Sequence, residues 1–164
     1  MCQTEYWAQE KLEVAKVNYM KYLYFLYEDD RYWIELDDKG FANRQIVLSD
    51  GCYHISAFEE CLAEGRIVEE DIDAKVTNIS HSDFELIWND ILKNHRSDWE
   101  SAKQKYKIND SITAELAFYY PQGPIFKVGN VFVKYTGNQD VIIHEKRIMK
   151  VIGYDETNMW IIAQ

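Results

Sequence analysis

The sequence predicts an α+β fold: a helix, an antiparallel meander and further helices in residues 1–100, followed by a five-stranded β-barrel in residues 101–164. Short strands punctuated by turn residues occur in both halves, whereas helical spacing is confined to the start and the middle of the chain. A chain of 164 residues, 47% of them apolar, can bury a core without disulfides or a metal. No stretch rich in proline, glycine or serine separates the halves, so we expect them to pack together.

Residues 4–18 have the pattern of an amphipathic helix. Thr4 is placed to cap its N-terminus, and Glu5, Glu10 and Glu13 lie toward its N-terminal half, where the helix dipole favours negative charge. The aromatic segment 19–27 that follows is compatible with the end of this helix or with a strand.

Short strands follow within residues 20–57. Stretches 32–37, 43–48 and 52–56 are separated by the turn sequences Asp38-Lys39-Gly40 and Ser49-Asp50-Gly51. Because Asp-Gly between alternating apolar residues is a strong hairpin signal, this region is predicted to be an antiparallel meander.

Residues 58–79 are acidic and irregular, with a short helix predicted at 58–63. Ser82 and Glu85 have the spacing of a capping box, which predicts that a helix begins there. A second helix is predicted at 97–106. The first of these two helices presents an apolar face made of Phe84, Ile87, Trp88, Ile91 and Leu92.

From residue 111 onward the pattern consists of strands only. Five strands in about 55 residues are typical of a small barrel of the OB type. Turn residues at 121–124, 129–130, 137–138 and 153–158 separate the stretches 112–120, 125–128, 131–135, 141–152 and 159–163.

These strands resemble the S1-type RNA-binding domain, a member of the OB fold. The resemblance is carried by Tyr106–Ala114, Tyr120–Val128 and Lys150–Glu156 with Trp160–Ile162, and it implies binding of single-stranded RNA. S1 domains stack bases on aromatic residues that flank the glycine of the second strand, and those positions are Gln122 and Ile125 in this chain. The histidine typical of the third strand corresponds to His144, although the usual loop after it is missing.

The nucleic-acid-binding candidates are cationic and aromatic side chains of the barrel. Stacking is worth about 1–3 kcal/mol per base, and lysines contact phosphates. The opposing interpretation is that the lysines are solvated charges on a β-surface, because residues 101–164 carry 8 basic and 6 acidic residues, a net charge of only +2. The candidate residues are Tyr119, Lys127, Phe132, Lys134, Tyr135, His144 and Lys146.

The N-terminal part is strongly acidic. Residues 1–100 hold 10 lysines and arginines against 22 acidic residues, a net charge of −12. Such a surface can select a basic protein partner, or it can serve solubility alone. Segments 34–40, 44–47, 50–51 and 84–88 are similar to small bacterial proteins of unknown function, some found among toxin–immunity systems. The second hypothesis is therefore an immunity-type or regulatory protein that binds a toxin or nuclease.

The remaining features point to a non-catalytic cytoplasmic protein. Acidic residues within the first 20 positions exclude a signal peptide, no run of 18 apolar residues predicts a membrane span, and Cys2, Cys52 and Cys61 are expected to be free thiols. His54 and His81 lack metal-ligand spacing to these cysteines, so neither a metal nor a cofactor is predicted. The carboxylate clusters lie in turns or acidic loops, and no catalytic motif occurs.

Overall fold

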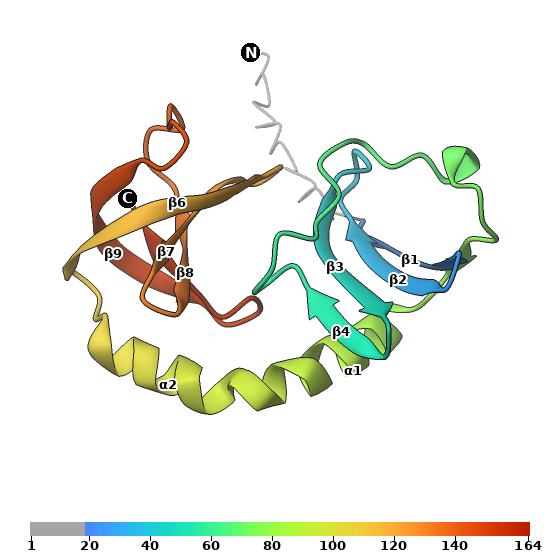
Figure 1. The fold of residues 1–164 in the computed structure, drawn as a ribbon, viewed down its shortest axis with the longest axis horizontal. Helices are drawn as coiled ribbons and strands as arrows, with labels where there is room; N and C mark the ends of the chain where they lie inside the picture. Colours follow the sequence, from blue (N-terminus) through green and yellow to red (C-terminus); the bar gives the residue numbers. More distant parts are fainter. Residues whose placement is uncertain (1–18) are drawn as a thin grey trace, which may run out of the picture.

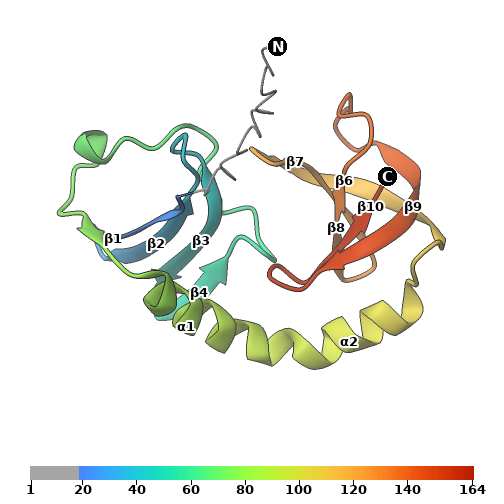
Figure 2. The same ribbon diagram turned by 180° about the vertical axis from the view of Figure 1, so that it is seen from behind.

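The computed structural model describes residues 19–164, which form two lobes joined by a pair of helices (Figure 1). The N-terminal lobe is an open β-sheet and the C-terminal lobe is a β-barrel, and the helices run along one side of both (Figure 2). The helix predicted at residues 4–18 lies outside the described residues. No helix within residues 19–164 is long and apolar enough to cross a membrane.

The N-terminal sheet confirms the predicted antiparallel meander. Segment 19–27 forms a strand from residue 21, and Asp50 and Gly51 link two strands with φ values of 49° and 75°, the two positive values that a tight hairpin turn requires. The strand order is β4-β3-β2-β1-β5. The strands are β1 (Lys21–Tyr27), β2 (Asp30–Leu36), β3 (Ala42–Ser49), β4 (Cys52–Ile55) and the short β5 (Thr77–Asn78).

Different parts of the chain cover the two faces of this sheet. Directly paired residues share a face, so the register places Tyr22, Glu35 and Arg44 in one row, and helix α1 (His81–Leu92) packs over that row. The opposite face, which includes Leu23, packs against apolar residues of the segment 62–76 and against the outer surface of the barrel.

The short helix predicted at 58–63 is absent, and the segment forms turns instead. The barrel occupies carbonyl groups that a helix would use. Trp160 Nε1 donates to the carbonyl of Ala57 at 2.7 Å, and the Tyr120 hydroxyl lies 3.0 Å from the carbonyl oxygen of Ser56 and 2.5 Å from that of Glu59. Tertiary hydrogen bonds therefore occupy these carbonyls, while the backbone N–H groups of Phe58 and Glu59 bond back to the carbonyl of Ile55 in a turn.

The two predicted helices are present as α1 and α2 (Arg96–Lys105), with a 3-10 turn, Lys93–His95, between them. The predicted start of α1 at Ser82 is wrong by two residues. Ser80 is the N-cap, and its capping box partner is Asp83. The side chain of Glu85 is not available for capping because it turns toward the sheet and pairs with Arg44.

The C-terminal lobe is the predicted five-stranded barrel, and it is closed, with the order β10-β8-β7-β6-β9. Its strand pairs are not all antiparallel, because β10 pairs with β8 in parallel. The closed five-stranded barrel is consistent with an OB-like fold. Its strands are β6 (Ser111–Tyr120), β7 (Gly123–Val128), β8 (Val131–Tyr135), β9 (Lys146–Asp155) and β10 (Trp160–Ala163).

Residues 141–145, predicted to open the fourth strand of the barrel, form a loop instead, and β9 begins at Lys146. Arg147 donates to the carbonyls of Asn138 and Asp140, both at 2.8 Å, and Glu145 accepts from the backbone N–H of Ile142 at 3.0 Å. His144 has a φ of 62°. The loop is thus shaped by charged side chains that bond its backbone, and the apolar Val-Ile-Ile run does not enter the sheet.

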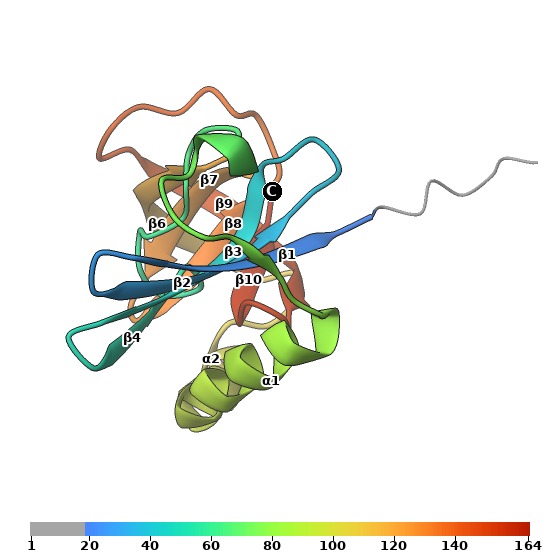
Figure 3. The ribbon, with the colours of Figure 1, turned by 90° about the vertical axis from the view of Figure 1, so that its right-hand side faces the viewer.

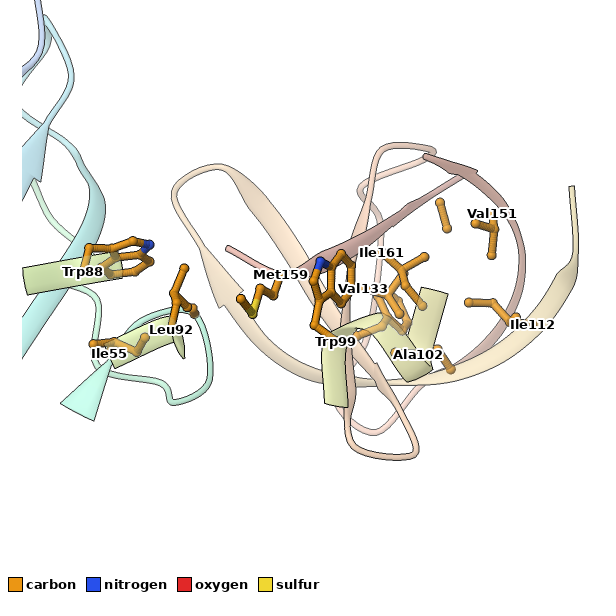
Figure 4. Close-up of a cluster of buried hydrophobic side chains, with 14 of the residues drawn as sticks. Ile55, Trp88, Leu92, Trp99, Ala102, Ile112, Val133, Val151, Met159 and Ile161 are labelled. Carbon is orange, nitrogen blue, oxygen red and sulfur yellow. The ribbon is translucent and has the colours of Figure 1, made fainter. Parts of the chain in front are cut away.

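The apolar core continues from one lobe to the other. One cluster of buried side chains runs from Ile55 and Trp88 through Met159 to the interior of the barrel (Figure 4). Trp88 also donates its indole N–H to the carbonyl of Thr157, in the turn before β10, at 2.7 Å. The lobes are therefore packed together, as the lack of a flexible linker predicted.

Candidate binding surfaces and the seam between the lobes

Three of the predicted nucleic-acid-binding residues gather on the outer surface of the barrel around Glu115. The register places Lys127 of β7 and Lys146 of β9 on either side of this glutamate. Lys146 Nζ and His144 Nδ1 each lie 3.9 Å from a carboxylate oxygen of Glu115. A carboxylate at the centre partly neutralises the positive charge that this group presents.

The predicted stacking aromatics are separated from one another. Tyr119 is 46% exposed, and its hydroxyl donates to the carbonyl of Gln139. Phe132 is only 8% exposed and belongs to the apolar cluster that the barrel shares with the N-terminal lobe. Tyr135 packs edge-on against Phe126, with Arg147 over its ring. Of the three, Tyr119 alone offers a large exposed ring surface.

The end of the N-terminal sheet carries an exposed apolar patch that was not singled out from the sequence. The register puts Leu26, Leu48 and Tyr53 on one face, in the row beside Tyr24 and Trp33. Leu26 is 51% and Tyr53 48% exposed. We call these five residues the hairpin patch, and the exposed Arg31 lies in the same row, between Leu26 and Leu48.

Carboxylates border the hairpin patch on the tips of the two hairpins. Glu28, Asp29 and Asp30 lie at the turn between β1 and β2, and Asp50 lies at the turn between β3 and β4. Both tips project at the same end of the sheet (Figure 3). The rings of the patch contact one another, since the centroid of Trp33 lies 5.2 Å from that of Tyr24 and 6.3 Å from that of Tyr53.

A buried ionic cluster lies under α1 on the same face of the sheet. The Arg44 side chain is held between Glu35, whose Oε1 accepts from Nε at 3.0 Å, and Glu85. Its guanidinium lies over the rings of Phe84 and Trp88, at 4.9 and 5.1 Å from their centroids.

The cluster shifts the pKa values of its members. Burial opposes the charge of Arg44, but the two glutamates outweigh it, so the pKa of Arg44 is raised. Burial likewise opposes ionisation of Glu85, and Arg44 outweighs it, which lowers the pKa of Glu85. Burial, reinforced by Glu35, raises the pKa of Tyr22 to about 12. Arg44, Glu85 and Tyr22 therefore each keep one charge state near neutral pH.

A polar cavity of about 280 Å³ lies at the seam between the lobes, beside this cluster. The candidate residue Lys134 lies here, apart from the Glu115 group. Three buried atoms in residues 19–164 have no hydrogen-bond partner, namely Arg44 Nη1, Gln122 Oε1 and Asn158 Oδ1, and all three belong to residues that line this cavity. The lining is completed by Glu35, Asn43, Asp155, Thr157 and Trp160.

A larger cavity of about 380 Å³ lies between α2 and the barrel and is more apolar. Its lining includes Phe58, Trp99, Tyr106, Phe132 and Met159. None of the three unpartnered buried atoms found in the described part of the chain belongs to this lining. The buried polar atoms without a hydrogen-bond partner therefore all belong to residues at the seam.

The cysteines and histidines weighed as metal ligands have other surroundings. His54 lies 2.7 Å from a carboxylate oxygen of Glu59, and His81 lies 2.8 Å from the hydroxyl of Tyr22. Cys52 is exposed, and burial raises the pKa of the Cys61 thiol to about 12. Residues 19–164 hold no group of three or more histidine, cysteine, aspartate or glutamate side chains arranged to bind a metal.

Comparisons with known proteins give no match to a family model, a curated protein or a solved structure. The resemblances to S1 domains and to proteins of toxin–immunity systems therefore stay predictions, and the closed five-stranded barrel is the one feature consistent with an OB-like fold.

The alternating residues of 20–57 contained a signal for the hairpin patch, because strand pairing at the Asp-Gly turn fixes which of them share a face. The seam, in contrast, joins segments distant in sequence.

Proposed function

We propose that the protein is a non-catalytic binding protein that recognises a basic protein partner through the hairpin patch. The carrying observation is that Leu26, Trp33 and Tyr53 share one partly exposed face beside the carboxylates of both hairpin tips. Aromatic residues are enriched among the side chains that dominate binding energy, and a charged rim speeds association and selects partners. A toxin or nuclease with a basic surface is the partner class that this combination favours.

The charge of the whole lobe supports this choice. Residues 19–100 hold 8 basic and 19 acidic residues, a net charge of −11. Arg44, one of the eight, is buried and neutralised by Glu35 and Glu85. The field outside the lobe is consequently negative, which attracts a basic protein and repels a nucleic acid.

The partner is tested with the purified product of a neighbouring gene that encodes a basic protein. Calorimetry is expected to give a complex that weakens as salt rises, and Tyr53→Ala is expected to reduce affinity at least tenfold. Ile148→Ala is the matched control, because it truncates an exposed apolar side chain on the barrel, distant from the patch. Equal affinities of the two variants would overturn the proposal.

Single-stranded RNA remains the second candidate ligand, because Lys127, His144 and Lys146 lie together and Tyr119 is exposed on the same barrel. Titration of a labelled oligoribonucleotide at low salt tests it. Binding that weakens with salt and is lost in Lys127→Ala with Lys146→Ala would favour RNA over a protein partner. Lack of binding at low salt would remove this candidate.

A further inference from the structure

The seam cavity presents two opposite charges that form no ion pair within residues 19–164. Arg44 and Glu35 satisfy each other within the buried cluster. Lys134 on β8 and Asp155 at the end of β9, two strands that flank β10 in the barrel, form no ion pair within residues 19–164. A molecule in this cavity therefore meets one available ammonium group and one available carboxylate.

Asp155 retains room for a further donor. Its Oδ1 accepts from the backbone N–H groups of Thr157 and Asn158 at 2.9 and 3.1 Å, and its Oδ2 accepts from Asn158 Nδ2 at 2.8 Å. An ionised carboxylate has about four acceptor positions. One position on Oδ2 is thus open after the turn has been satisfied.

The lining residues contain one unpartnered hydrogen-bond donor and two unpartnered acceptors. Gln122 Nε2 donates to the carbonyl of Asn43 at 3.3 Å, and Asn158 Nδ2 donates to Asp155, so each amide is oriented with its oxygen unbonded. Two acceptors therefore require donors. Arg44 Nη1, on a residue that is 5% exposed, lacks an acceptor. Leaving such groups unsatisfied costs about 1–3 kcal/mol each.

We propose that the seam cavity binds a small zwitterionic molecule, an α-amino acid being the chemical class that fits. Its carboxylate meets Lys134, and its ammonium group meets Asp155. The cavity of about 280 Å³ lies just below the range of roughly 300–1,000 Å³ that holds drug-sized ligands, which suits a molecule of this size.

The charge balance argues against the simpler ligand classes. A phosphate or a plain carboxylate would satisfy Lys134 but would also face Glu35 and Asp155. A sugar would offer hydroxyl groups to the amides and leave both free charges unpaired. Only a ligand with both signs complements the two free charges at once.

Thermal unfolding in the presence of each common amino acid at about 10 mM tests the proposal. Acetate, which has only the carboxylate, ethylamine, which has only the ammonium group, and glycerol, which is polar but uncharged, are the control compounds. At least one amino acid is expected to raise the melting temperature by several degrees, and none of the three control compounds is expected to do so. No shift with any amino acid, which leaves water as the occupant, would overturn the proposal, as would an equal shift with acetate.

Two variants locate the effect. Lys134→Met and Asp155→Asn are each expected to weaken binding of the stabilising amino acid at least tenfold in calorimetry, whereas Lys127→Met on the outer barrel surface leaves it unchanged. Asp155→Asn keeps one oxygen as the acceptor for the backbone N–H groups of Thr157 and Asn158 but removes the oxygen that accepts from Asn158 Nδ2, so its folding is checked by the melting temperature without ligand. Binding unaffected by both seam variants would place the ligand elsewhere. The seam variants do not alter the hairpin patch, so binding of the basic protein partner can be measured separately and tests the proposed function independently of amino-acid binding.

Discussion

The two lobes bury their apolar side chains in different ways. The barrel closes on itself, and alternate residues of its own strands, such as Phe126, Val133 and Ile161, fill its interior. The N-terminal sheet is open, and it depends on α1 for one face and on the segment 62–76 and the barrel for the other. An open sheet has an end that no other element covers, and the hairpin patch lies there.

The difference also decides where charge is buried. Among the described ionic contacts, the closely bonded pair of Arg44 and Glu35 is the one with both side chains less than a tenth exposed, and it lies in the N-terminal lobe. Closure lets the barrel be apolar inside, whereas a sheet covered by an amphipathic helix retains charged residues at the helix–sheet junction. The buried pair of Arg44 and Glu35 is thus a feature of the N-terminal lobe.

Of the changes considered, removal of the buried cation Arg44 should cause the largest difference in stability between the two lobes. Arg44→Met leaves Glu35 buried without its partner and is expected to lower the free energy of unfolding by about 3–5 kcal/mol. Hydrogen exchange should show the earliest loss of protection in β1–β3. Lys93→Met, which breaks an exposed pair with Asp90, is the control and should cost at most about 1 kcal/mol. Equal effects of the two variants would contradict a structural role for the buried cluster.

A matched pair of core truncations sharpens the comparison further. Ile46 in the open sheet and Ile161 in the barrel are both fully buried. Each change to alanine is expected to cost about 2–5 kcal/mol. Because one apolar cluster joins the lobes, both variants should unfold in a single transition in urea, detected alike by circular dichroism and tryptophan fluorescence. Two separated transitions would mean that the lobes unfold independently.

The smallest expected effect concerns acid. The pKa of Glu85 in the folded protein is lowered below its ordinary value of 4.5, so its contribution to stability is complete above about pH 4.5 and is lost as the pH falls below that value. A decline of roughly 1 kcal/mol is expected for a pair that is a quarter exposed on the glutamate side. Glu85→Gln should flatten this part of the curve of unfolding free energy against pH, and an unchanged slope would contradict the assignment.

The strands were predictable from sequence wherever alternation and turn residues agreed. The Asp50-Gly51 turn and the segments 111–135 illustrate this agreement. The prediction failed where side chains far away in sequence redirected the backbone. Tyr120 and Trp160 hold the carbonyls of segment 56–59, and Arg44 draws Glu85 from the cap of α1.

The candidate sites show the same division. Alternation along β7 fixes the side on which Lys127 lies, and this lysine is exposed on the outer surface of the barrel. Phe132 has the same alternation, yet the N-terminal lobe covers it. Gln122 and Asn158 carry no local signal at all, since their role depends on how the turns of the barrel meet β2 and β3.

The position of Trp160 has a consequence for biosynthesis. Its bond to the carbonyl of Ala57 spans 103 residues, and β10 is the last strand of the barrel in chain order. Neither the closed barrel nor the seam can form until the ribosome has released the chain through residue 163, so the earlier strands wait with unpaired edges. Contacts of such large sequence separation also slow the final folding step. One face of the N-terminal sheet, which packs against the barrel in the folded protein, therefore stays uncovered during synthesis until the barrel closes.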